Sequence, residues 1–369
     1  MLVGWRTGLL AFGAVVAGAI AATAAPEAPR RPFPQHVQYT PDTILPTHRA
    51  RAQLDADVVA AWTQWKTRYL ASAVTATRGP PRFRVKSLRV NVELTIAEGQ
   101  GYGMLLAAFM AGADVDARQI FDGLFKFSAD HQSEVDPRLF DYEVPPDEAP
   151  NSKCDDSDSS AFDGDADIAY ALLLADQQWG SNTGAIDYRA RALEVLAGTL
   201  APEIGPTSRL PMLGDWVDPV GPDKNEWTPR TSDFMPGHFR VFREVIGVAA
   251  WGRVRTAVLE AARSLRLNFA PTTGLLPDFA EPDSAIDHTL HPARPNFLHD
   301  VTDGAYCFNA GRVPWRLGLD ALHSGDATAW DGALTIANWA EGTLLGDPFK
   351  LHEGYTLDGT ALDPEEHSK

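Results

Sequence analysis

The residue that says most about chemistry is Glu98, a carboxylate that stands directly before an apolar segment. Three alternate glycines follow it, Gly99, Gly101 and Gly103, and then the apolar run Met104–Met110. Glycine allows backbone conformations closed to other residues and a close approach to a ligand. The pattern therefore predicts a glycine-rich turn that presents Glu98 at the entrance of a buried helix.

A second group of carboxylates precedes another apolar segment. Asp163, Asp165 and Asp167 alternate with small residues just before Ile168–Trp179. Two carboxyl groups on rigid supports suit glycoside hydrolysis, in which one group donates a proton and the other activates water. The simpler alternative is that these side chains cap helices, or that they are stabilised by the positive end of a helix dipole.

The elements that must position these residues are mostly helical. Apolar residues recur at spacings of three and four in many segments, whereas only Arg84–Thr95 alternates like a strand. Long connections rich in Gly, Pro, Trp and Asp join the helices, which predicts that function lies in loops on a helical frame. The predicted helices are Asp55–Leu70, Gly103–Ala111, Ala117–Phe127, Ile168–Trp179, Tyr188–Leu200, Phe239–Ile246, Trp251–Leu267, Val313–Ala321 and Ala329–Thr343.

The N-terminal part divides into two segments. Residues 1–25 contain a basic residue, an apolar run and a small-residue end, which predicts a cleavable export signal and a secreted or periplasmic protein. An uncleaved membrane anchor is the alternative, but the apolar run is shorter than a spanning helix needs. Residues 26–53 are proline-rich and predict an extended arm, and residues 54–369 predict a single catalytic domain.

Charge and cysteine content narrow the class of protein. The formal net charge of −17 excludes nucleic-acid binding, which requires clustered Lys and Arg. The acidic residues between 141 and 167 fit a solvated loop, since no glutamate closes a calcium-binding pattern, and we expect no metal. Cys154 and Cys307 can form a disulfide in an oxidising compartment or remain two free thiols.

The motifs reached so far resemble glycoside hydrolase family 8, a family of inverting β-glycanases, over roughly residues 60 to 320. The segment Glu98–Met104 looks like the general-acid motif of that family, Asp163–Asp165 with its helix like the second signature, and Asn309–Arg316 like the third. Other matching segments are Trp62, Trp65, Lys66 and Tyr69, the loop Arg230–His238, and Thr273–Phe279.

The resemblance implies an all-α fold, an (α/α)6 barrel, and an inverting hydrolase without a cofactor. Glu98 is then the general acid, and Asp163 holds the distorted sugar ring. In the endoglucanase-type branch the general base is an Asp at the position of Asn309, and an amide cannot take a proton from water. The chain instead resembles the branch with Asn there, in which the loop Pro295–Tyr306 offers Asp300 as the base and Asp303 as an alternative.

Several further residues are candidates for binding the sugar. Aromatic rings can stack on the apolar faces of sugars, and polar groups can bind their hydroxyls. Each of these residues has an ordinary alternative as part of the core, a salt bridge or a surface hydrogen bond. The candidates are Tyr102, Asp165, Arg312, Trp216, Trp227, Asp233, His238 and Trp315.

We therefore expect an enzyme that cleaves internal β-1,4 bonds of a glucan-like polysaccharide, which is its one expected partner. We also expect a monomer that is not stably inserted in a membrane once the signal has been removed. A chitosanase is the first alternative, since negative charge attracts a polycation; a lichenase and an oligoxylan hydrolase are others. A glycan-binding protein that has lost its base, which Asn309 would permit, and a polysaccharide lyase are alternatives of other classes.

Overall fold

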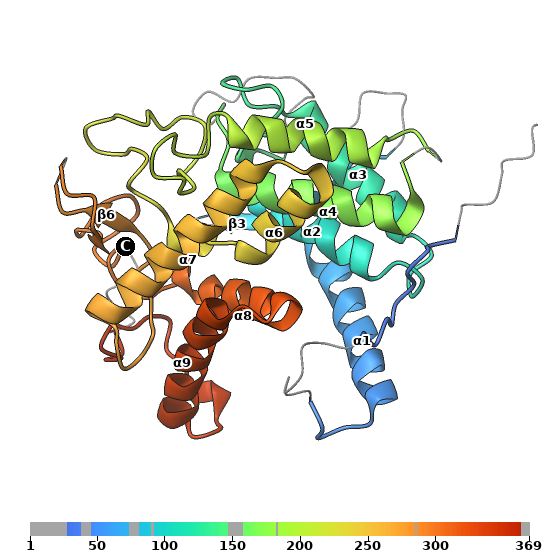
Figure 1. The fold of residues 1–369 in the computed structure, drawn as a ribbon. Helices are drawn as coiled ribbons and strands as arrows, with labels where there is room; N and C mark the ends of the chain where they lie inside the picture. Colours follow the sequence, from blue (N-terminus) through green and yellow to red (C-terminus); the bar gives the residue numbers. More distant parts are fainter. Residues whose placement is uncertain are drawn as a thin grey trace, which may run out of the picture.

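The computed structural model describes residues 28–37, 46–73, 81–89, 92–146, 158–181, 184–284 and 286–362, which are mainly helical (Figure 1). No helix within these ranges has the length and apolar character needed to cross a membrane. The α-helices of the described residues are α1 (Arg51–Tyr69), α2 (Ala97–Phe109), α3 (Ala117–Asp130), α4 (Phe162–Trp179), α5 (Tyr188–Leu200), α6 (Pro236–Ile246), α7 (Ala249–Phe269), α8 (Val313–Ser324) and α9 (Ala327–Leu344).

Short strands and 3-10 helices fill the connections. Within the described ranges the strands form three small antiparallel sheets, of which the three-stranded one leads directly into α2. The strands are β1 (Leu70–Ser72), β2 (Phe83–Val85), β3 (Ser87–Arg89), β4 (Val92–Ile96), β5 (Glu143–Val144), β6 (Ala280–Pro282) and β7 (Leu290–Pro292), and the 3-10 helices are η1 (Thr231–Asp233), η2 (Ala310–Arg312) and η3 (Pro348–Lys350).

The helices alternate between two layers. Helices α2, α4, α6 and α8 contact one another in sequence order, and each also packs against the helix that follows it, α3, α5, α7 and α9 respectively. Helices α2, α4, α6 and α8 thus form an inner series, which α3, α5, α7 and α9 cover. This arrangement is visible for α4 and α5 in Figure 1.

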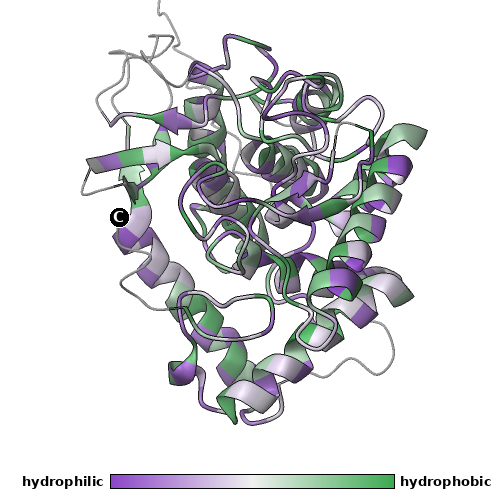
Figure 2. Cartoon of the chain, turned by 90° about the vertical axis from the view of Figure 1, so that its left-hand side faces the viewer, coloured by the Kyte–Doolittle hydropathy of each residue, from purple (hydrophilic) through white to green (hydrophobic). Residues whose placement is uncertain are grey.

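Amphipathic helices build the core between the layers. In α3, Ile120, Phe121 and Leu124 are buried while Gln119 is exposed, as expected for a helix with one apolar face. Figure 2 shows the same division, with hydrophobic and hydrophilic residues sharing individual helices.

Two helices start six residues earlier than their sequences predict, the largest differences among the helix starts. Helix α2 begins at Ala97 and α4 at Phe162, rather than at Gly103 and Ile168, so the predicted glycine-rich turn is wrong. The glycines instead allow the two helices to touch: a Cβ at Gly164 would lie 2.5 Å from the Cβ of Ala97. Their close approach places Glu98 and Asp163 in the first turns of adjacent helices.

The described part of the proline-rich arm lies on the folded domain. The backbone N–H of Arg30 donates to the carbonyl of Gln178 at the end of α4 (2.8 Å), and that of Phe33 donates to the carbonyl of Ala111 after α2 (2.7 Å). Helix α1 begins at Arg51, three residues before the predicted start of the domain. The predicted export signal and Cys154 lie outside the described residues, and Cys307 is buried.

Candidate active site

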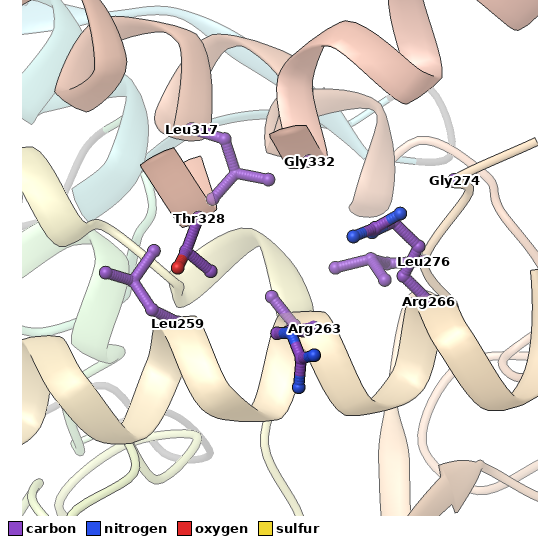
Figure 3. Close-up of a pocket in the computed structure, with 9 residues that line it drawn as sticks. Leu259, Arg263, Arg266, Gly274, Leu276, Leu317, Thr328 and Gly332 are labelled. Carbon is purple, nitrogen blue, oxygen red and sulfur yellow. The ribbon is translucent and has the colours of Figure 1, made fainter. Parts of the chain in front are cut away.

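A cavity of about 480 Å³ opens where the first turns of α2 and α4 meet the loops before α6 and α8. A second cavity, between α7, α8 and α9, measures only about 10 Å³ (Figure 3). A volume of that size holds no more than a single water molecule, so it is a packing gap. The larger cavity is lined by Ile96, Ala97, Glu98, Tyr142, Ser159, Ser160, Ala161, Asp163, Leu213, Trp216, Arg230, Leu298, His299, Phe308, Asn309 and Arg312.

Glu98 is held at this cavity by two side chains. The hydroxyl of Tyr102, one turn along α2, donates to Glu98 Oε1 (2.7 Å), and Arg312 forms an ion pair with the same oxygen. The Glu98 side chain is 19% exposed, so it remains open to the cavity. Tyr102 therefore orients Glu98, whereas the sequence predicts that its ring forms part of the sugar-binding wall.

Arg312 connects Glu98 to a chain of buried polar groups. Its Nη2 donates to Ser232 Oγ and to Asn309 Oδ1, both at 2.8 Å. Asn309 Nδ2 in turn donates to Asp278 Oδ2 (3.2 Å). The amide of Asn309 donates through Nδ2 and accepts through Oδ1, so the orientation of this side chain is fixed.

Burial shifts the pKa values of Asp278 and Arg312, the groups at the two ends of this series of hydrogen bonds. It raises the pKa of Asp278 to about 6, although backbone N–H groups of Ala310 and Cys307 donate to the carboxylate and oppose the shift. Burial, together with the nearby charge of Arg316, lowers the pKa of Arg312 to about 9, which leaves it a cation at neutral pH.

Asp163 is bound by groups from several segments. Its Oδ1 accepts from the backbone N–H of Gly164 (3.0 Å), and its Oδ2 accepts from Arg230 Nη1 (3.0 Å) and lies 3.5 Å from Arg312 Nη1. Asp233 lies on the far side of Arg230, at 3.6 Å from its Nε, and is fully buried. Burial raises the pKa of Asp233 to about 7, against the opposing charge of Arg230.

His238 and Asp167 form a buried cluster with Arg316, and none of the three lines the cavity. Arg316 makes two hydrogen bonds to Asp167, at 3.1 and 2.7 Å, and His238 Nε2 lies 2.8 Å from Asp167 Oδ1. Burial would raise the pKa of Asp167, but Arg316 and His238 lower it to about 2. The contacts of His238 are those of a structural residue, and its predicted role in sugar binding remains a prediction.

Asp165 is also fully buried and belongs to a separate group of carboxyls. Asp165 accepts a hydrogen bond from the backbone N–H of Phe140 (3.1 Å) and lies near Glu203 and Asp215. The hydroxyl of Ser160 donates to Glu203 (2.6 Å), and the backbone N–H of Ser160 donates to Asp215 (2.8 Å). Burial and the neighbouring carboxylates raise the pKa values of Asp165 and Glu203 well above the ordinary range. This group supports the cavity wall from behind Ser160.

Of the four predicted aromatic binding residues, the structure brings one to the cavity. Trp216 lines it and is 44% exposed. Trp227 stacks on His288 with ring centroids 4.1 Å apart, and Trp315 packs against Tyr102 and lies under the guanidinium of Arg316. Neither Trp227 nor Trp315 lines this cavity, and the sugar-binding role predicted for each remains a prediction.

The loop that carries the predicted base turns back on itself. Asp303 is 2% exposed, and its carboxylate accepts the backbone N–H groups of Leu298 (2.6 Å), His299 (2.9 Å) and Asp300 (3.2 Å). Asp300 Oδ1 accepts two hydrogen bonds from Thr302. Neither carboxylate lines the cavity, although Leu298 and His299 do. The predicted bases thus serve the loop itself, and a catalytic role for either remains a prediction.

Sequence reasoning missed several residues of the cavity wall. Three of them lie within or beside segments that the motifs single out, namely Arg230, His299 and Phe308. Arg230 shares a loop with Asp233, and His299 precedes Asp300, so a closer look at the neighbours of these carboxylates could have found both. Tyr142, Ser159 and Ser160 come from a connection without a motif. Among the described residues, no group of three or more His, Cys, Asp or Glu side chains is arranged to hold a metal.

Comparison with known proteins identifies the family. The family model of glycosyl hydrolases family 8 matches residues 43–293. A β-glucanase of Niallia circulans is 36% identical over 335 residues, covering 90% of this chain and 77% of that protein. An endoglucanase of Bacillus sp. strain KSM-330 is 34% identical over 340 residues, covering 90% of this chain and 69% of that one.

A solved structure gives the same result. The apo structure of a β-1,3-1,4-glucanase from Paenibacillus sp. X4 superposes with a TM-score of 0.83 at 35% identity, covering 91% of this chain and 84% of that one. The all-α fold of (α/α)6-barrel type is confirmed, and the protein is a glycoside hydrolase that acts on a glycan. This chain belongs to glycosyl hydrolases family 8.

Proposed function

We propose that this enzyme cleaves internal β-1,4 bonds of a glucan by an inverting mechanism, with Glu98 as the proton donor. The observation that carries the proposal is the position of Glu98, which lines a large cavity from a rigid helix and is held by Tyr102 and Arg312. Inverting hydrolysis needs such a donor and a second group that removes a proton from water.

Glu98 must carry a proton to act as a donor, and the ion pair with Arg312 favours its charged form. Arg312 does not depend on Glu98 alone, because Ser232 and Asn309 also accept from it. When a glycan displaces Arg312 from Glu98 and excludes water, desolvation favours the protonated carboxyl. In this scheme Asp163 accepts hydroxyl hydrogen bonds from the sugar beside the reacting bond.

The second group lies on the loop 295–306, which contributes Leu298 and His299 to the cavity. That loop offers Asp300, which the sequence predicts as the base.

The charges around the cavity favour a neutral polysaccharide. Two carboxylates, Glu98 and Asp163, are balanced by Arg230 and Arg312, so the net negative charge of the chain is not concentrated where the substrate binds. A polycation such as chitosan would therefore meet no net negative charge from these four side chains. The names of the similar β-glucanase and endoglucanase support the same choice.

The test compares reducing ends released from carboxymethylcellulose, mixed-linkage β-glucan, chitosan and xylan. We expect the two glucans to be cleaved fastest, with a rapid fall in viscosity that reports internal cleavage. NMR of the first product formed should show the α-anomer. Retention of the β-anomer would contradict inversion, and preference for chitosan or xylan would contradict the proposed substrate.

We further propose that the protein is exported before it acts, because residues 1–25 have the composition of an export signal. The measurement is the N-terminal sequence of the protein recovered outside the cytoplasm. Removal of a segment ending near Ala25 is expected.

A further inference from the structure

Asp278 is a buried carboxylate, 2% exposed, that does not line the cavity but is bonded to the segment that brings Asn309 and Arg312 to it. We propose that Asp278 is a positioning residue of the reaction, which acts on the proton donor Glu98 through Arg312. This inference rests on the proposed function, because it concerns the protonation of Glu98 in the same reaction.

Four N–H groups donate to the carboxylate of Asp278. Its Oδ1 accepts from the backbone N–H groups of Cys307 (3.0 Å) and Ala310 (2.7 Å). Its Oδ2 accepts from the backbone N–H (3.3 Å) and from the side-chain Nδ2 (3.2 Å) of Asn309. A carboxylate can accept on both oxygens, whereas an amide side chain has one accepting oxygen. Asp278 therefore fixes the backbone of residues 307–310 and the direction of the Asn309 side chain.

The Asn309 side chain in turn helps to determine where Arg312 points. Nη2 of Arg312 donates to Asn309 Oδ1 and to Ser232 Oγ, both at 2.8 Å, whereas its Nε makes no hydrogen bond within the described residues. Because a guanidinium is planar, fixing Nη2 restricts where Nη1 can lie. Nη1 is the nitrogen that pairs with Glu98 and lies 3.5 Å from Asp163 Oδ2. One nitrogen of Arg312 is thus an anchor, and another contacts the two cavity carboxylates.

The backbone around Asp278 supports the second anchor. Ser232 lies in η1, where the backbone N–H of Thr231 donates to the carbonyl of Asp278 (3.0 Å). The hydroxyl of Thr231 also donates to the carbonyl of Pro277 (2.6 Å). Both anchors of Arg312 are therefore attached to the same short segment, one through a side chain and the other through the backbone. A substitution of the Asp278 side chain tests the first anchor alone.

The proposed reaction gives this anchoring a purpose. Arg312 must leave Glu98 when the glycan enters, so that the donor can hold a proton. The guanidinium leaves more readily if another acceptor retains it, and Asn309, held in place by Asp278, is such an acceptor. Without the Asp278 carboxylate the Asn309 amide is free to turn. Arg312 then stays on Glu98 and favours its charged form, which cannot donate a proton.

The experiment measures kcat and KM for glucan cleavage by Asp278→Asn, Arg312→Gln and the double variant. Asp278→Asn keeps the size of the side chain but exchanges one accepting oxygen for a nitrogen that cannot accept. We expect kcat to fall by about 10²-fold, the lower end of the range for general acid catalysis, with little change in KM. In the Arg312→Gln background the same substitution should cause no further loss, because Asp278 acts through Arg312.

Asp114→Asn is the matched control. Asp114 also accepts from a backbone N–H, that of Asp116 (2.9 Å), and from Trp62 Nε1 (2.6 Å), but it follows the end of α2 opposite to Glu98. We expect this variant to unfold at a lower temperature than the wild type and to keep its kcat. The proposal is overturned if Asp278→Asn keeps the wild-type kcat, or if its loss is the same with and without Arg312.

A second variant covers the case in which Asp278→Asn does not fold. Asn309→Ala breaks the same series one bond nearer to Arg312, and it should lower kcat in the wild type but not in the Arg312→Gln background. An equal fall in both backgrounds also overturns the proposal. If the wild type cleaves no glucan, or Glu98→Gln retains full activity, the proposed function fails instead, so the two failures are distinguishable.

Discussion

Glu98 and the loop 295–306 lie on the same cavity, but different parts of the molecule hold them in place. Glu98 stands in the first turn of α2, which α4 approaches closely because Gly164 has no side chain. Its carboxylate is held by Tyr102 from the same helix and by Arg312 from the start of α8. The position of the donor therefore depends on the packing of the inner helices.

The loop is stabilised mostly from within. Asp303 accepts three of its backbone N–H groups, and Phe297 anchors it against Phe279, with ring centroids 5.8 Å apart. No α-helix or strand passes through residues 295–306. The comparison teaches that changes in the helix packing beneath Glu98 should disturb the whole fold, whereas changes in the loop should affect catalysis locally.

The largest effect is expected for Glu98→Gln, which removes the proton and keeps the shape of the side chain. We expect kcat to fall by about 10³-fold, within the range for loss of a general acid, while glucan affinity is retained. Glu244→Gln is a suitable control, since Glu244 is 60% exposed on α6 and pairs with Arg240. Equal loss in both variants would show that the effect is not specific to the donor.

The second prediction tests whether the donor side depends on helix packing. In Gly164→Ala the new methyl group would lie 2.5 Å from the Cβ of Ala97, so α2 and α4 must separate. We expect a loss of about 1–3 kcal/mol in the free energy of unfolding, measured by denaturant titration, together with reduced activity.

Gly318→Ala in α8 is the matched control for this substitution. A Cβ there meets nothing within 4 Å, so the change should stabilise the helix by roughly 0.5–1 kcal/mol. If the two variants had the same stability, close packing at Gly164 would not matter.

The third prediction concerns the loop alone. Asp303→Asn replaces an oxygen that accepts backbone N–H groups with an amide nitrogen that cannot accept. We expect kcat to fall about tenfold, equivalent to about 1.4 kcal/mol, because residues 298–300 lose their fixed position. The melting temperature should change much less than in Gly164→Ala, and a large fall would show that the loop is part of the core.

The smallest effect is a change in the pH dependence of stability. Burial raises the pKa values of Glu203 and Asp165. Above the ordinary carboxyl pKa of about 4 the unfolded chain releases these protons while the folded chain keeps them. The free energy of unfolding therefore falls as pH rises.

Glu203→Gln removes one of these titrations but keeps an acceptor for Ser160. The loss of stability between pH 5 and pH 8, followed by thermal unfolding, should be smaller in this variant than in the wild type. An unchanged loss would mean that Glu203 is already ionised in the folded protein over this pH range.

The sequence predicts the helices better than the site. Each of the nine predicted segments overlaps an α-helix, because apolar periodicity reports burial directly. It fails at the starts of α2 and α4, since alternate glycines that suggest a turn are used here for contact between helices.

For the site, Glu98, Asp163, Arg312 and Trp216 line the cavity as their predicted roles require, although those roles remain to be tested. Asp165 and His238 could not be separated from them by sequence. A buried carboxylate and one that faces a cavity look alike until the direction of each helix face is known. The same limit applies to His299, which lines the cavity although its neighbour Asp300 does not.

The proline-rich arm ties together the ends of α2 and α4 that lie farthest from Glu98 and Asp163. Gln178 of α4 bonds to the backbone of Arg31 in the arm and to the carbonyl of Ala108 in α2. A recombinant form trimmed to begin at α1 would lose the hydrogen bonds to Arg31. The last turns of α2 and α4 would then be free to fray. We therefore expect a form without residues 28–37 to unfold at a lower temperature than one that keeps them, and purification tags are best placed upstream of these residues.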